Sequence, residues 1–189
     1  WARLTTQYAS NGAGIFFAPE IGDEVVLGYF DNDPTYPVII GSLHSSKRPP
    51  PYASDAANNI KAIVTRSKSK IEFNDEDKVV TVTTAGNNKI ILNDKDKSIQ
   101  LLDQNGNKVE MTPSGISLDS PKDIRINAKG SVAIEAVGKI DITSKADVIN
   151  SGLNVKCDAQ VSFVAKGSAS AELSAAGETV VKGAMVMIN

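Results

Sequence analysis

The chain repeats a short strand and a turn every eight residues over part of its length. Residues 123–146, "DIRINAKGSVAIEAVGKIDITSKA", divide into three lines of eight residues. The second and fourth residues of each line are apolar, and these residues are Ile124, Ile126, Val132, Ile134, Ile140 and Ile142. Side chains two residues apart on a strand point to the same face, so each pair lines one face of a short strand. We therefore expect Arg125, Glu135 and Asp141 to point away from the core.

A strand and turn of this length is too short to enclose a core by itself. One coil of a single-chain β-solenoid needs about twenty residues or more to circle a filled interior. Three chains that each contribute one line would supply such a coil, and would pair strand edges that a lone chain leaves open. The repeat therefore predicts an intertwined, triple-stranded β-helix formed by a homotrimer, with the six apolar residues as its core. A single-chain β-helix with irregular coils is the alternative, and an ordinary up-and-down sheet is favoured least.

A longer repeat precedes the eight-residue one. The stretch "IEFNDEDKVVTVTTAGNNK" aligns without a gap on the next stretch, "IILNDKDKSIQLLDQNGNK", and seven of nineteen positions are identical. Each unit holds two strand-like pieces joined by "NDEDK" or "NDKDK". We assign residues 70–189 to one β-helical needle, with two 19-residue repeats at 71–108 and approximately octapeptide repeats at 109–189. The eight-residue register slips at 147–159.

The first 47 residues differ in composition from the needle. Eight of the ten aromatic residues lie between Trp1 and Tyr52. The apolar pieces "WARLTT", "GIFFAPE", "EVVLGYF" and "PVIIGSL" are separated by turn formers, which predicts four short strands of a small antiparallel sheet or barrel and little helix. Three successive prolines in "KRPPPY" favour a stiff connector, which we assign to residues 48–69.

Charge and the scarcity of reactive side chains argue against several functions. A net charge of −2 with mixed signs gives no electrostatic footprint for nucleic acid. The lone Cys157 excludes an intramolecular disulfide, and the lone His44, although near serines, lacks an orienting acid and an oxyanion hole. The acidic turns at 74–77 and 93–96 indicate solvated β-turns rather than calcium loops, because Lys95 opposes cation binding. The sequence thus predicts no enzyme, no metal site and no cofactor.

Residues 13–52 carry a family resemblance. Its features are Phe16, Phe17, the run Pro19–Val25, Gly28, Asp33-Pro34, Pro37-Val38 and Gly41-Ser42-Leu43. In order and spacing they resemble the last strands of the OB-type domain in VgrG proteins and related phage-tail spike proteins, including baseplate protein V. The resemblance implies that residues 1–47 are the C-terminal strands of such a domain, with its earlier strands and a base domain outside this chain. The repeats downstream resemble the trimeric β-helical needle of the same proteins.

The resemblance also implies a function and partners. It implies a structural spike of a contractile injection system that punctures a target envelope, is mounted on tube and baseplate proteins, and carries secreted effectors. A PAAR-repeat tip protein would dock on the apolar C-terminal end, which consists of Met185, Val186, Met187, Ile188 and Asn189. Such a spike is assembled in the bacterial cytoplasm or in a phage or tail-like particle and then injected. The sequence shows neither a signal peptide nor a membrane-spanning apolar run.

Three other functions compete with the spike. A trimeric tail fibre or adhesin that binds surface glycans is the main alternative, but it needs aromatic or acidic residues along its shaft. A β-helical polysaccharide-degrading enzyme needs clustered carboxylates. An OB protein that binds single-stranded nucleic acid needs a basic groove, whereas residues 1–50 have a net charge of −2.

Overall fold

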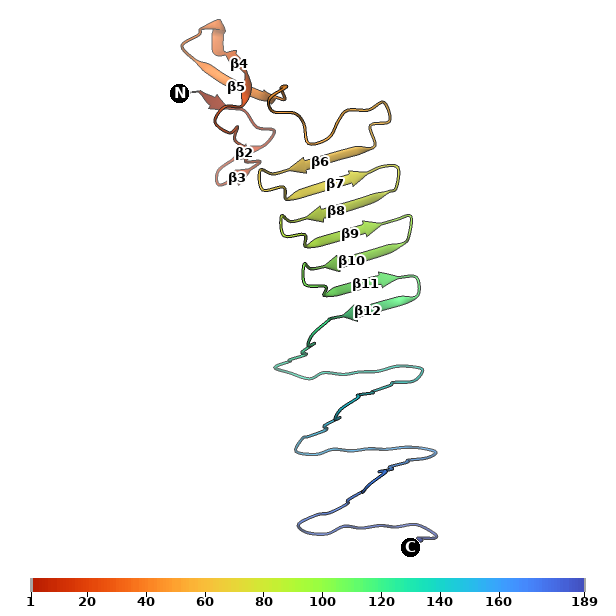
Figure 1. Ribbon diagram of the computed structural model, residues 1–189. Helices are drawn as coiled ribbons and strands as arrows, with labels where there is room; N and C mark the ends of the chain where they lie inside the picture. The colour runs from red at the N-terminus through yellow and green to blue at the C-terminus, as the bar shows by residue number, and fades with distance from the viewer. Residues whose placement is uncertain (1, 189) are drawn as a thin grey trace. The chain divides into compact units, whose positions relative to one another are not determined.

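The computed structural model describes residues 2–188 and divides into two compact units, residues 1–127 and residues 128–189. The regular structure of the described residues consists of β-strands and one turn of 3₁₀ helix, η1 (Phe30–Asn32) (Figure 1). The predicted all-β class and the near absence of helix are therefore confirmed. Among the described residues no helix has the length and apolar content needed to cross a membrane.

A small three-stranded sheet forms near the N-terminus. Strand β5 (Pro37–Leu43) lies between β4 (Glu24–Tyr29), its antiparallel partner, and β1 (Arg3–Leu4), with which it pairs in parallel. Val38 of β5 is the only buried apolar residue among those described. The sheet as it stands therefore has almost no core of its own.

Two details of this region differ from the sequence predictions. The piece "GIFFAPE" is not a strand, because pairing ends with the two-stranded hairpin of β2 (Ala9–Ser10) and β3 (Ala13–Gly14). After Gly14 the chain joins no sheet until β4, and Phe16 is 89% exposed and Ile21 fully exposed. The sheet is also not purely antiparallel, since β1 pairs in parallel with β5. Alternating apolar residues fix strand faces but not strand direction.

The next part of the chain is a seven-stranded antiparallel sheet whose strands pair in chain order (Figure 1). The strands are β6 (Ile60–Val64), β7 (Lys70–Asn74), β8 (Val79–Thr83), β9 (Lys89–Asn93), β10 (Ser98–Leu102), β11 (Lys108–Thr112) and β12 (Gly115–Asp119). This is an up-and-down sheet, the arrangement that the sequence analysis favoured least for the needle. In addition, β6 lies within the segment assigned to the connector, where the alternation in "IKAIV" marks a strand.

The chain reverses here because side chains close tight turns. In the turn after β7, Asn74 Oδ1 accepts a hydrogen bond from the Asp77 backbone N–H at 3.0 Å. The turn one repeat later uses Asn93 Oδ1 and the Asp96 N–H at 2.9 Å. Each turn ends in a lysine with positive φ, 56° at Lys78 and 52° at Lys97. The repeated "ND-D-K" motif is thus a reversing turn that turns each 19-residue unit back on itself.

The left-handed backbone at Lys97 gives a stability prediction. A side chain in this conformation costs about 1–2 kcal/mol, which glycine avoids at some cost in unfolded-state entropy. We expect Lys97→Gly to stabilise the protein by about 0.5–1 kcal/mol per chain. Thermal unfolding followed by circular dichroism measures the shift. Lys97→Ala, which keeps a Cβ, serves as the control and should give no gain; an equal gain from both variants would contradict the prediction.

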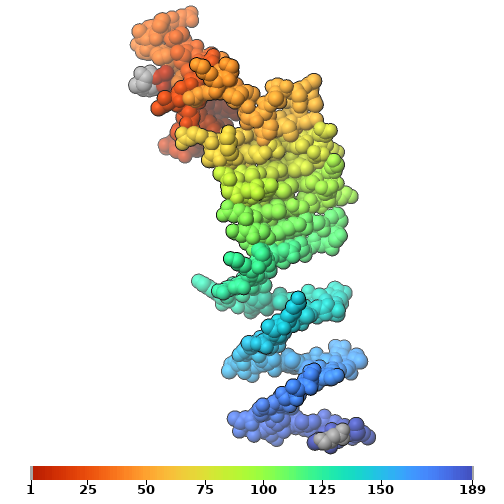
Figure 2. Space-filling view, viewed as in Figure 1, coloured from red at the N-terminus to blue at the C-terminus, as the bar shows by residue number. Residues whose placement is uncertain are grey.

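After β12 the chain continues without regular pairing. Residues 123–188 make no backbone–backbone hydrogen bond within the described chain. Extended segments alternate with bends at 121–122, 129–130, 137–138, 145–146, 152–153, 160–161, 168–169, 176–177 and 184–185. In the unit from residue 128 onward, successive turns of the chain stand apart with open space between them (Figure 2). The backbone groups of this coil therefore have no backbone partner within the described chain and stand open to water or to another chain.

Candidate assembly interface

One face of the seven-stranded sheet is apolar from strand to strand. Directly opposed pairs such as Ile71 with Val82 and Val82 with Ile90 continue into a ladder along the sheet. We call this surface the apolar face. Its members are Ile63, Ile71, Phe73, Val80, Val82, Ile90, Leu92, Ile99, Leu101, Val109, Met111, Ile116 and Leu118. Eleven of these side chains are exposed, from 36% at Val82 to 74% at Ile116, and Val80 and Val109 are half-buried.

The opposite face, which we call the polar face, is mainly polar, and its polar groups pair within the chain. Its larger apolar members are Ile60, Val64, Val79, Ile91 and Leu102. Lys70 Nζ lies 2.6 Å from Glu72 Oε2, and Lys108 Nζ lies 2.7 Å from Glu110 Oε2. Gln100 donates a hydrogen bond to Glu110 at 2.7 Å. Because these groups pair within the chain, the polar face can remain against water. The apolar face is the one that needs a cover.

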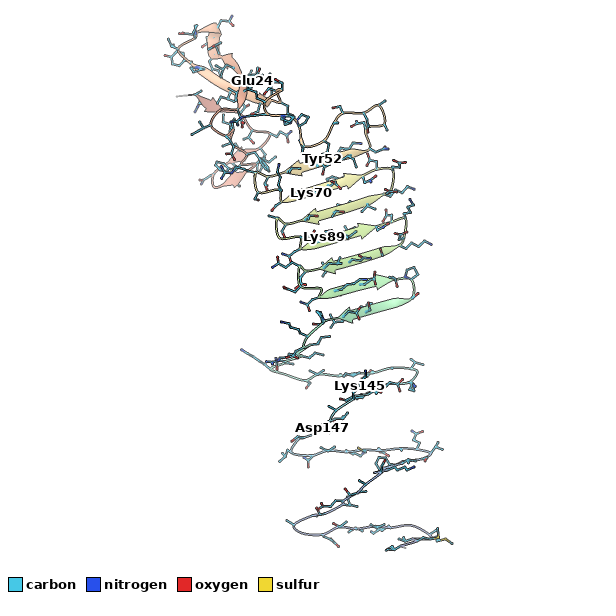
Figure 3. All side chains as sticks on the ribbon, in the orientation of Figure 1. Glu24, Tyr52, Lys70, Lys89, Lys145 and Asp147 are labelled. Atoms are coloured by element: carbon cyan, nitrogen blue, oxygen red, sulfur yellow. The ribbon has the colours of Figure 1, made fainter. Side chains whose placement is uncertain are left out.

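Tyr52 ties the proline-rich connector to the polar face (Figure 3). Its hydroxyl donates a hydrogen bond to Glu72 and accepts one from Lys70 Nζ at 3.1 Å. The same ammonium lies 5.7 Å from the centre of the Tyr52 ring. The hydrogen bonds from Lys70 and Tyr52 lower the pKa of Glu72, while those to Glu72 and Tyr52 raise the pKa of Lys70. The cluster therefore stays charged at neutral pH and holds the connector in place.

Two carboxylates of the first acidic turn form ion pairs with lysines. Lys95 Nζ lies 2.8 Å from Asp77 Oδ1, and Lys61 pairs with Asp75. No group of three metal-ligating side chains occurs among residues 2–188. The turns thus act as links along one edge of the sheet.

Asp103 organises the turn before β11 and gives a pH prediction. Hydrogen bonds from the side chains and backbone N–H groups of Asn107 and Asn105 lower the pKa of its carboxyl to about 2. The unfolded chain binds this proton near pH 3.9, so it holds more protons than the folded chain between about pH 4 and pH 2. The contribution of this turn to the free energy of unfolding is therefore fully present above about pH 4 and is lost as the pH falls towards 2. We expect Asp103→Ala to lower the thermal midpoint at pH 7 and to have a smaller effect near pH 2. A difference in thermal midpoint between the variant and the wild type that stays constant from pH 7 to pH 2 would contradict this role of Asp103.

The six predicted core residues lie in the unpaired coil. They occupy the second and fourth positions after successive bends, and their exposed fractions run from 49% at Ile140 to 73% at Ile142. A single chain does not bury them. Their burial between chains stays a prediction.

The other singled-out residues do not form a reactive site in the described chain. His44 is exposed, and the neighbouring Ser45 hydroxyl accepts a hydrogen bond from the Arg48 backbone N–H at 3.2 Å. Cys157 is exposed. At the C-terminal end Met185, Val186, Met187 and Ile188 are 49–90% exposed, and Asn189 lies outside the described residues.

The apolar face was not predicted from the sequence. Its signal was present in the two 19-residue repeats, where Ile71 and Phe73 correspond to Ile90 and Leu92. The pattern was assigned to coils of a helix, so these residues were not grouped as one surface. Only the pairing of the strands brings them together.

The fold and this surface define a class of protein: an all-β chain that leaves the apolar sides of its strands uncovered, a kind of surface that typically marks a protein-interaction site. Residues 1–44 match the family described as the type VI secretion system/phage-baseplate injector OB domain. These residues are therefore similar to that OB-domain family.

The chain is also similar to named spike proteins. It is 27% identical over 84 residues to the type VI secretion system spike protein VgrG1a of Pseudomonas aeruginosa, a match that covers 41% of this chain and 13% of that protein. It is 33% identical over 52 residues to the spike protein VgrG4b of the same organism, covering 28% of this chain and 6% of that protein. The actin cross-linking toxin VgrG1 of Vibrio cholerae is 33% identical over 52 residues, covering 28% and 5%. The predicted relation to the VgrG and baseplate spike family is confirmed, and the matches span at most 13% of these relatives' length.

Proposed function

We propose that this chain is the shaft-bearing part of a homotrimeric spike from a contractile injection system. The observation that carries the proposal is an apolar sheet face and an unpaired coil on the same chain. Three copies would cover the apolar faces by packing them against one another around an axis. The coils would then hydrogen-bond with strands of the other two chains in a triple-stranded β-helix.

The physical gain from such assembly is large. Burying apolar surface contributes about 25 cal/mol per Å², and the thirteen residues of the apolar face are repeated in three chains. Backbone groups of residues 123–188 would gain partners that the single chain does not provide. The folded state of one chain would then depend on the others, as in obligate oligomers.

The mechanism is mechanical rather than catalytic. A contracting sheath drives the spike through a target envelope, so the shaft has to resist bending and unfolding. Intertwined strands offer no single hairpin that can detach first, which favours slow unfolding. The OB-type residues would join the shaft to baseplate and tube proteins, and the spike would carry effectors into the target. We propose no enzymatic activity for this chain.

The C-terminal end provides the docking site for a tip protein. Met185, Val186, Met187 and Ile188 expose apolar surface at the end of the coil, with Asn189 beyond them. An apolar end of three chains would attract a cap of matching apolar surface. A PAAR-repeat protein is the cap we propose, in keeping with the family.

The mass of the purified chain tests the proposal. Light scattering after size-exclusion chromatography should give about three times the 20.0 kDa of one chain. A monomeric mass for soluble, β-rich protein would overturn the trimer and with it the spike. Specific binding on a glycan array by a trimer would instead favour the tail-fibre alternative.

A further inference from the structure

The spacing of the bends contains one irregularity. Successive bends are eight residues apart throughout the coil, except between 145–146 and 152–153, where the interval is seven. The register slip in the sequence thus corresponds to one coil that is a single residue short. When positions are counted from the preceding bend, the second and fourth positions can be compared directly on both sides of the short coil.

The inward positions change character at this coil. Before it, the second and fourth residues after each bend are isoleucine or valine throughout. In the short coil these positions hold Val148 and Asn150. Beyond it they hold Val155, Cys157, Phe163, Ala165, Ala171, Leu173, Thr179, Val181 and Met187. Asn150 is therefore the first polar residue at an inward position, and the side chains beyond it are smaller on average.

These features weaken coupling along the coil. In a quasi-one-dimensional repeat structure, stability is close to a sum of layer terms and contacts between neighbouring layers. An inward asparagine has four hydrogen-bonding sites to satisfy and contributes little apolar area. A missing residue also disturbs strand pairing, because a shift of one residue turns side chains to the other face. Both changes fall in the same coil.

We propose that the coil from Ala146 to Gly152 is a joint that divides the needle into two cooperative units. The proximal unit, residues 121–145, has the larger inward side chains and unfolds only when the seven-stranded sheet region unfolds with it. The distal unit, residues 153–188, opens separately and more often. The inference rests on the proposed trimer, in which the second and fourth positions face the axis.

Hydrogen exchange of the intact trimer, followed by mass spectrometry of its peptides, tests the joint. We expect peptides from residues 153–188 to exchange at least about tenfold faster than those from 123–145, with the step inside the short coil. A protection that declines smoothly from the C-terminal end, or that is uniform, would overturn the proposal, since fraying alone gives no step.

A repaired variant distinguishes the joint from a merely weak tip. Asn150→Val combined with one alanine inserted after Ser151 restores an apolar inward position and an eight-residue interval. We expect the exchange rate just beyond the coil to fall at least about threefold towards the proximal value. Asn154→Val, at an outward position, is the matched control and should leave the step unchanged. A repaired trimer with an unchanged step would show that the coil is not a joint, whereas a monomeric wild-type mass would refute the trimer itself.

Discussion

Ile90→Lys is expected to abolish trimer formation, whereas Ile91→Lys is expected to leave a trimer. The two isoleucines are neighbours on β9 and point to opposite faces of the sheet. Ile90 stands in the apolar ladder between Val82 and Leu101, and Ile91 stands on the polar face between Thr81 and Gln100. Three lysines brought together in an apolar interior would cost several kcal/mol each.

These two variants distinguish a trimer from a lone chain, because side-chain exposure in the single chain predicts the opposite order of damage. In the isolated chain Ile90 is 44% exposed, and Ile91 is the less exposed of the two. If the chain functioned alone, lysine at Ile91 would therefore be the more damaging change. Light scattering measures the mass of each variant, and thermal unfolding measures its stability. Greater damage from Ile91→Lys would contradict packing through the apolar face.

The second large effect is expected in the coil. Ile134→Asp should prevent the coil from assembling, because each trimer would hold three carboxylates at an inward position. The cost of an uncompensated buried charge is several kcal/mol per ion, comparable to the whole stability of a domain. We expect loss of the cooperative unfolding transition of the needle and a large rise in proteolysis after residue 120.

Ala133→Asp provides a control one residue away. Ala133 lies between Val132 and Ile134 on the extended segment, so its side chain points to the opposite side. In the trimer this position faces water and should tolerate a carboxylate with little change in midpoint. Equal sensitivity at both positions would contradict the alternation that defines the core.

Several features of the fold could be predicted from local sequence. The eight-residue spacing of Ile124, Val132 and Ile140 matches the spacing of the bends that precede them. Successive residues of a strand point to opposite faces, so the face on which each residue lies follows from its position along the strand. The OB-domain match at residues 1–44 includes the run from Pro19 to Val25, on which the resemblance was predicted.

Chain direction was not predictable in the same way. β-Turns were predicted at 74–77 and 93–96. That the chain reverses there depends on a left-handed backbone at Lys78 and Lys97, for which lysine gives no local signal. The sequence analysis therefore assigned residues 71–108 to coils, whereas they form hairpins of an up-and-down sheet. β6 was placed in the connector because of the prolines that precede it, although its own residues alternate.

By itself the sequence determined the period, the apolar side of each strand and the family of the N-terminal residues, because these depend on neighbours along the chain. The tertiary structure decided which strands pair, that the repeats at 71–108 present one continuous apolar face, and that one coil is a residue short. Those features depend on turn conformation and on contacts between residues far apart in sequence. A local pattern can permit such contacts but cannot select them.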